Sequence, residues 1–122
     1  MIGAIIGDMI GSPYEFDRSP KIKDFGPLFI GASVFTDDSV MTIAVADGLM
    51  KAGRDADADT IKKEVIRSMK AWGRKYPYSG YGGRFIRWLQ LEDDSPYGSW
   101  GNGSAMSVSW KCAYYDMSRK TG

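Results

Sequence analysis

The amino-acid sequence predicts an all-α protein. Apolar residues recur at intervals of three and four, glycines and prolines separate these periodic segments, and no run alternates cleanly between apolar and polar residues. At 122 residues the chain is long enough for one domain with one core. We therefore expect a single helical domain in which loops join five helices.

The first helix is expected over residues 2–16, as a buried element. Its glycines allow close packing, and its apolar side chains lie at helical spacing, at Ile2, Ile5, Ile6, Met9 and Ile10. Residues 17–35, which contain two prolines and two glycines, should form a loop.

The second and third helices should build the centre of the domain. Residues 38–52 are apolar nearly all round, so this second helix should lie centrally, with Gly53 capping its end. Asp59 or Thr60 should cap the third helix, with Glu64 as the capping-box partner. It should end at about residue 76, because a proline follows.

The last third of the chain contains two further helices. A glycine-rich loop at residues 78–83 leads to a short fourth helix, which is marked by Phe85, Trp88 and Leu89. Another loop covers residues 93–103, and residues 104–119 read as a fifth helix.

Charge and hydropathy exclude two classes of partner. With 16 basic and 15 acidic residues the chain lacks the basic surface of a dedicated nucleic-acid binder. Its most apolar segment, residues 1–16, contains two acids and is shorter than the ~20 apolar residues of a membrane span.

Cys112 is the only cysteine, so it forms no intramolecular disulfide, and without a histidine partner we expect it in the core. We expect a cytoplasmic protein.

The segment Thr36-Asp37-Asp38 precedes the second predicted helix and allows two interpretations. Thr or Asp at a helix start caps the free backbone N–H groups. Alternatively, two adjacent carboxylates and a hydroxyl coordinate a divalent cation, which offsets their mutual repulsion. With no histidine and one cysteine in the chain, Mg²⁺ fits better than Zn²⁺. A helix start is suited to both roles.

Asp8 and Glu15 are seven residues apart and share one face if the first helix extends that far. A carboxylate in an apolar segment is costly unless it is paired. Asp8 therefore either binds the N–H groups of a nearby loop or a basic residue, or it serves a ligand. Glu15, placed near a glycosidic bond, could act as general acid or base.

The segment from Ser99 to Met106 is interpreted either as a loop whose Asn102 or Ser104 caps the fifth helix, or as a backbone cradle for phosphate or ribose. The glycine-rich loop at residues 80–83 could also approach a phosphate closely. Three aromatic residues could stack on an adenine or lie in the core, namely Tyr78, Tyr81 and Trp100.

Together these segments resemble the ADP-ribosylglycohydrolase family, whose members remove ADP-ribose from modified side chains or small acceptors. The family pattern Gly-Asp-x-x-Gly-x-x-x-Glu matches Gly7, Asp8, Gly11 and Glu15. Its Thr-Asp-Asp-Thr metal motif matches residues 36–39, with Ser39 in the last place. Its Tyr-Gly-Asn-Gly-x-Ala-Met-Arg loop matches residues 100–106, with Ser107 where arginine is common.

The resemblance implies an orthogonal all-α bundle with two Mg²⁺ ions in a cleft. Thr36, Asp37 and Asp38 would bind metal, and the catalytic residues would be Glu15, Asp37 and Asp38. The substrate, ADP-ribose on a side chain or small acceptor, would contact Asp8, Gly82, Ser99, Gly101, Asn102, Gly103 and Met106.

One family element does not occur after Asp38: the Asp-x-Asp-Thr/Ser motif of the second metal half-site. We therefore expect residues 1–122 to be the truncated, N-terminal portion of such a domain, with one metal half-site and weak or no activity alone. The alternatives are a non-catalytic module that binds ADP-ribose or a nucleotide, and an interaction protein. In the last case an exposed half-core would pair with a second copy or with a complementing C-terminal chain.

Overall fold

The computed structural model describes residues 1–20, 23–24 and 26–98. These ranges contain no strand and form the elements α1 (Ile2–Gly11), η1 (Ser12–Tyr14), α2 (Asp37–Ala52), α3 (Ala58–Lys75) and α4 (Gly83–Gln90). The all-α prediction is confirmed for this part of the chain. The predicted helix at residues 104–119 and Cys112 lie outside it.

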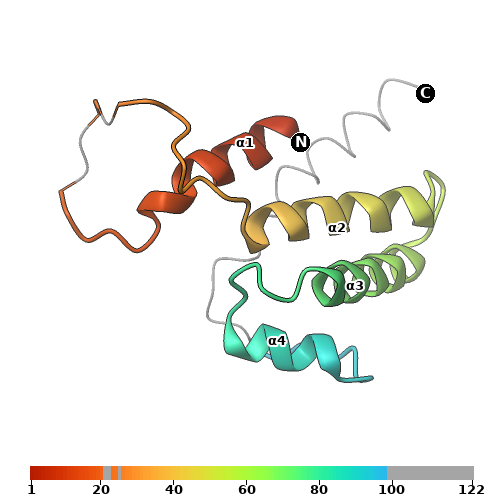
Figure 1. Ribbon diagram of the computed structural model, residues 1–122. Coiled ribbons are helices and arrows are strands. Elements are labelled where there is room, and N and C mark those ends of the chain that lie inside the picture. The colour runs from red at the N-terminus through yellow and green to blue at the C-terminus, as the bar shows by residue number, and fades with distance from the viewer. Residues whose placement is uncertain (21–22, 25, 99–122) are drawn as a thin grey trace.

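The core lies between α2, α3 and α4. Figure 1 shows α2 and α3 side by side, with α4 on the far side of α3 and α1 on the far side of α2. Eight residues of α2 are buried, so the prediction of a central second helix is confirmed. The buried core cluster joins α2 to the loop before α4 and to α4 itself through Val40, Met41, Ala44, Tyr81, Trp88 and Leu89.

Two glycines allow the helices to approach closely. A Cβ atom at Gly48 of α2 would lie 2.6 Å from the Val65 Cα atom of α3. A Cβ atom at Gly73 of α3 would also meet a neighbour at 2.6 Å, but that neighbour is the flexible side chain of Leu89. The backbone contact at Gly48 therefore sets the separation of α2 and α3.

We expect Gly48→Ala to destabilise the fold, because the backbone of α3 must move to admit the new methyl group. Overpacking of this kind costs about 1–3 kcal/mol. Gly73→Ala should cost less, since Leu89 can change rotamer. The matched control is Gly7→Ala on α1, where nothing lies within 4 Å of the new Cβ atom. That variant should gain roughly 0.5–1 kcal/mol of stability, and equal effects of the three substitutions in urea denaturation would contradict the close contact.

Polar side chains also connect α2 to α3. The Asp47 carboxylate accepts hydrogen bonds from the Ser68 hydroxyl at 2.5 Å and from Trp72 Nε1 at 3.1 Å, and it pairs with Lys51 at 2.7 Å. Hydrogen bonds to the Lys51 ammonium and the Ser68 hydroxyl lower the pKa of Asp47 to about 2. Asp47 therefore stays ionised through the neutral and mildly acidic range.

A buried lysine holds the segment after α4. The Lys70 ammonium donates to the Leu91 carbonyl at 2.7 Å and to the Asp93 carbonyl at 2.9 Å. It also pairs with the Asp94 carboxylate at 2.7 Å and lies 4.8 Å from the centroid of the Trp88 ring. The chain after α4 is thereby fixed against α3.

Three sequence expectations about helices need correction. The first helix ends at Gly11 rather than at residue 16, and a 3-10 turn containing Pro13 follows it. Proline donates no backbone hydrogen bond, which explains the change of helix type. The third helix is capped by Asp57, two or three residues before the predicted cap, because the Asp57 side chain accepts from the Thr60 N–H at 2.7 Å. Glu64 pairs with Arg67 instead of acting as a capping-box partner.

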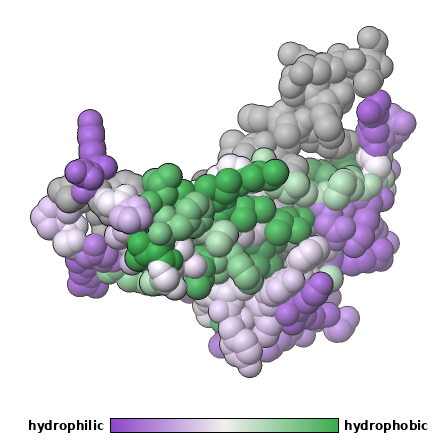
Figure 2. All heavy atoms as spheres, turned by 45° about the horizontal axis from the view of Figure 1, so that its top comes forward, coloured by the Kyte–Doolittle hydropathy of each residue, from purple (hydrophilic) through white to green (hydrophobic). Residues whose placement is uncertain are grey.

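The expectation that the first helix is buried is also wrong for the described structure, since none of the residues of α1 is buried there. Figure 2 shows a continuous hydrophobic area on one face of the molecule. Exposed apolar side chains are concentrated in residues 1–35 and include Met1, Ile2, Ile6, Leu28, Phe29 and Val34. Within the described ranges, no helix is both long and apolar enough to cross a membrane.

Candidate functional site

The site is built where α1 meets the start of α2, and Asp8 makes the connection. Asp8 Oδ2 accepts hydrogen bonds from the Thr36 N–H at 2.7 Å, the Ser39 N–H at 3.2 Å and the Ser39 hydroxyl at 2.5 Å. Asp8 Oδ1 accepts from the Thr36 hydroxyl at 2.6 Å. The carboxylate of α1 thus binds free donors in the first turn of α2, where the helix dipole favours negative charge.

Thr36 is the N-cap of α2. Its hydroxyl accepts a hydrogen bond from the Asp38 N–H at 3.3 Å while donating to Asp8. The capping interpretation of Thr36 is therefore confirmed, as is the interpretation that Asp8 bonds nearby backbone N–H groups. A hydroxyl oxygen has two lone pairs, so one lone pair of Thr36 remains for a further partner.

The loop before α4 completes the other side of the site. The Asp37 N–H donates to the Ser79 carbonyl at 2.7 Å, which fixes this loop to the start of α2. Gly80 has a φ of +97°, a conformation that glycine adopts without strain, and a Cβ atom there would lie 3.8 Å from Asp37 Oδ1. The backbone of Gly80 therefore lies beside the Asp37 carboxylate.

Four carboxylates influence one another at this place, and we call Asp8, Glu15, Asp37 and Asp38 the acidic cluster. Burial, together with the charges of Asp38, Glu15 and Asp8, raises the pKa of Asp37 to about 6. Burial and the Asp8 charge also raise the pKa of Asp38. Among the described residues, neither carboxylate of Asp37 and Asp38 accepts a hydrogen bond from another residue.

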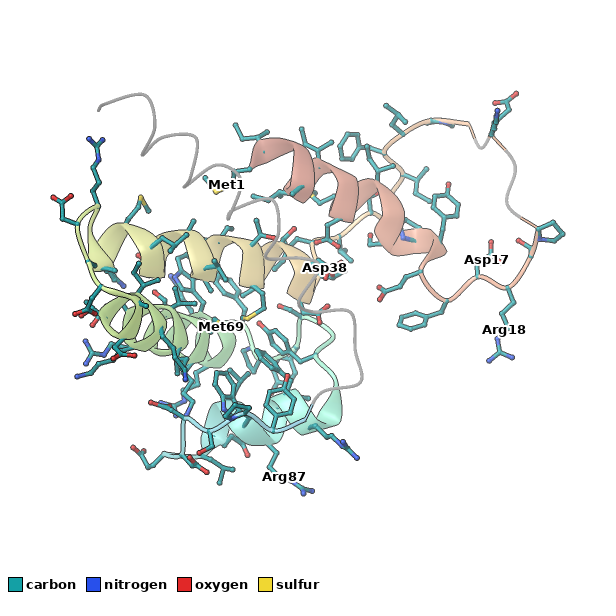
Figure 3. All side chains as sticks on the ribbon, turned by 180° about the vertical axis from the view of Figure 1, so that it is seen from behind. Met1, Asp17, Arg18, Asp38, Met69 and Arg87 are labelled. Carbon is teal, nitrogen blue, oxygen red and sulfur yellow. The ribbon has the colours of Figure 1, made fainter. Side chains whose placement is uncertain are left out.

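Glu15 contributes to the acidic cluster from a position after η1, and not from the helix that carries Asp8 as the sequence predicted. Residues 8 and 15 do not share a continuous helix, because α1 ends at Gly11 and Glu15 follows η1 as its C-cap. Glu15 is exposed, yet its charge contributes to the raised pKa of Asp37. Figure 3 shows Asp38 at the start of α2, close to α1.

The donor set of the acidic cluster fits a hard divalent cation in part. Carboxylate and hydroxyl oxygens are suitable ligands for Mg²⁺, and a cation would offset the repulsion that raises the pKa of Asp37. In the described part of the chain, however, no three His, Cys, Asp or Glu side chains come close enough together to hold one ion. The residues therefore fit a half-site in which a cation keeps several waters.

Two groups of predicted site residues remain. Gly82 is the N-cap of α4, and an added Cβ atom there would meet nothing within 4 Å. The predicted cradle lies outside the described residues, and it comprises Ser99, Gly101, Asn102, Gly103 and Met106.

Sequence reasoning missed two residues that build the site. The sequence pattern accounts for Ser39 only as a variation of the metal motif, whereas in the structure its N–H and hydroxyl both bind Asp8. Ser79 was part of a glycine-rich loop whose partner was not predicted, and it binds the Asp37 N–H. A serine within the first turn of a helix is a signal for Ser39, since that turn carries free donors. Ser79 has no comparable signal.

The comparison with known proteins agrees with this arrangement of motifs. A sequence profile of the family described as ADP-ribosylglycohydrolase matches residues 1–117. No curated protein and no solved structure matches the chain. The profile covers the acidic cluster, the loop before α4 and the predicted cradle. The chain belongs to the ADP-ribosylglycohydrolase family.

Proposed function

We propose that the acidic cluster serves the Mg²⁺-dependent hydrolysis of the glycosidic bond that links ADP-ribose to a protein side chain or small acceptor. One observation supports this proposal more than the others. The Asp37 and Asp38 carboxylates are held close together, partly removed from water, with the charges of Asp8 and Glu15 nearby. Carboxyl groups whose pKa is raised by burial and by neighbouring negative charges are typical of functional sites.

The proposed Mg²⁺ ligands are Thr36, Asp37 and Asp38. The hydrogen bonds of Thr36 to Asp8 and to the Asp38 N–H fix the orientation of the hydroxyl, so its remaining lone pair is preorganised. When bound, Mg²⁺ would supply positive charge that orients sugar hydroxyls and stabilises developing negative charge.

Glu15 and Asp8 have different proposed roles. Glu15 is exposed and close enough for its charge to affect Asp37, so it is available to exchange a proton at the anomeric centre. Asp8 uses both oxygens to bind Thr36 and Ser39, so we propose that it acts mainly by positioning the start of α2. A direct contact between Asp8 and substrate stays a prediction.

Backbone groups would hold the rest of the substrate. Gly80 and Gly82 lie in the loop that Ser79 fixes to Asp37, and backbone N–H groups in such a loop can face a diphosphate. The cradle at residues 99–106 has the same proposed role.

The proposal predicts release of ADP-ribose from an ADP-ribosylated peptide in the presence of Mg²⁺ and none in EDTA. Asp38→Asn should lower the rate at least about 100-fold, in the range seen when a group that stabilises charge is removed. Asp24→Asn, an exposed acid without a partner in the described structure, is the control and should retain the full rate. The readout is free ADP-ribose measured by chromatography, with arginine-linked and serine-linked substrates.

Two results would contradict the hydrolase proposal. Binding of ADP-ribose without release from any substrate would favour the non-catalytic module. Equal rates in EDTA and Mg²⁺, or equal rates for Asp38→Asn and Asp24→Asn, would show that the acidic cluster takes no part in the reaction.

A further inference from the structure

A second candidate site lies on α4, away from the acidic cluster. A pocket of about 310 Å³ is formed between α4 and the segment that follows it. Its walls combine two arginines with apolar and aromatic side chains, namely Arg84, Arg87, Trp88, Leu91, Pro96 and Tyr97. None of the four acids of the cluster contributes to it. We call it the α4 pocket.

The two arginines give the α4 pocket a positive charge. Arg84 and Arg87 are three residues apart on one helix, so their side chains are neighbours on its surface. The only acid in the lining is Asp93, and its Oδ1 atom already accepts from the Ser95 N–H at 2.9 Å and the Ser95 hydroxyl at 2.6 Å. The lining thus contains two guanidinium groups and one carboxylate, and that carboxylate is already hydrogen-bonded.

Within the described part of the chain, both guanidinium groups keep donors without a partner. Arg84 donates through Nη1 to the Gly98 carbonyl at 3.2 Å. Arg87 forms no hydrogen bond or ion pair with any other described residue. Figure 3 shows Arg87 projecting from α4 away from the rest of the bundle. A guanidinium group has five N–H donors, and its planar shape suits a phosphate.

The other wall of the α4 pocket contains aromatic side chains. The Trp88 and Tyr97 rings pack with their centroids 5.9 Å apart, and the Lys70 contacts to the Leu91 and Asp93 carbonyls hold the segment that carries Tyr97. Half-buried Tyr97 presents part of its ring to the pocket. A flat ring of a ligand can stack on such a surface.

We propose that the α4 pocket binds a mononucleotide, with its phosphate on Arg84 and Arg87 and its base against Tyr97. The volume is at the lower end of the range for small-ligand pockets, which suits a ligand with one base, one sugar and one phosphate. The phosphate would relieve the repulsion between the two guanidinium groups. This site is independent of the proposed hydrolase chemistry.

The test is calorimetric titration of AMP into the full chain, in EDTA and at low salt. We expect AMP to bind, and Arg87→Gln to weaken binding about tenfold or more, as for the loss of a charge-assisted hydrogen bond. The matched control is Arg18→Gln, which removes the same charge from an exposed loop after η1 and should leave AMP binding unchanged. Because Arg87 is exposed, an unchanged melting temperature is expected for its variant.

Further titrations test the phosphate contact, the base contact and the location of the site separately. Adenosine and inorganic phosphate should each bind at least about tenfold more weakly than AMP, and equal binding of either would overturn the corresponding contact. Asp37→Asn should leave AMP binding unchanged. Absence of AMP binding, equal affinities for the Arg87 and Arg18 variants, or loss of AMP binding in the Asp37 variant alone would overturn the site on α4. The proposed hydrolase activity does not depend on these outcomes.

Discussion

Asp8→Ala is expected to lower the free energy of unfolding by about 3 kcal/mol or more. The substitution removes the acceptor of four hydrogen bonds, two from Thr36 and two from Ser39. Hydrogen bonds to a charged group contribute roughly 1.5–3 kcal/mol each, and four that share one carboxylate are not additive. The loss is large because the freed donors include buried Ser39 and the first N–H groups of α2.

Asp8→Asn removes the negative charge of this side chain but keeps its shape, so it tests the two contributions separately. An amide keeps one acceptor oxygen but places an NH₂ group against the Thr36 or Ser39 donors, so we expect an intermediate loss of stability. The control is Asp24→Ala, since Asp24 is exposed and has no partner in the described structure. Urea denaturation followed by far-ultraviolet circular dichroism gives the three values. A stability of Asp8→Ala close to that of Asp24→Ala would show that α1 is not held through this carboxylate.

Asp37→Asn is expected to stabilise the metal-free protein and to abolish its response to Mg²⁺. In the wild-type chain, burial and the three neighbouring acids raise the pKa of Asp37 from 3.8 to about 6. The folded state therefore binds a proton at Asp37 more tightly than the unfolded state does. Wild-type stability should consequently fall as the pH rises from about 4 to about 6, and asparagine removes this loss.

The pH dependence provides the internal check. The stability gained in Asp37→Asn should be largest above pH 6 and should disappear below about pH 4, where Asp37 is protonated in both states. Mg²⁺ should raise the melting temperature of the wild-type chain by binding the folded state, and it should have no effect on the variant. Thermal melts with and without Mg²⁺ across this pH range test both statements. A variant that is less stable than the wild type at pH 7 in EDTA would contradict the repulsion.

The central helices were predictable because local signals and packing agree there. The run at residues 38–52 is apolar nearly all round, and the structure buries eight residues of α2. Gly53 has a φ of +87° and follows the last residue of α2, as a capping glycine should. Elsewhere a local signal was present but was given too little weight. Pro13 lies inside the predicted first helix, and the structure changes helix type there.

The partners within the site could be predicted only in part. The types of residue at positions 8, 15, 37 and 38 indicated a polar site, and the structure brings their charges together. The sequence does not reveal which donors Asp8 binds, because Thr36 and Ser39 lie about thirty residues away and are reached through a loop without periodic pattern. The α4 pocket was missed for a similar reason. It depends on how the Lys70 ammonium holds the chain after α4, and that contact has no counterpart in local spacing.

The helix α1 is attached to α2 through the Asp8 carboxylate, and none of its residues is buried. This attachment determines what fraction of the molecules has the acidic cluster assembled. A segment held mainly by polar contacts opens and closes as its own unit, more often than the α2–α3 pair comes apart. Glu15 would leave with it, so only the closed fraction of molecules presents all four acids at once. Under the proposed function, a sugar or cation that bridges Glu15 and the start of α2 would bind with an affinity reduced by that fraction, and its binding would shift the population toward the closed form.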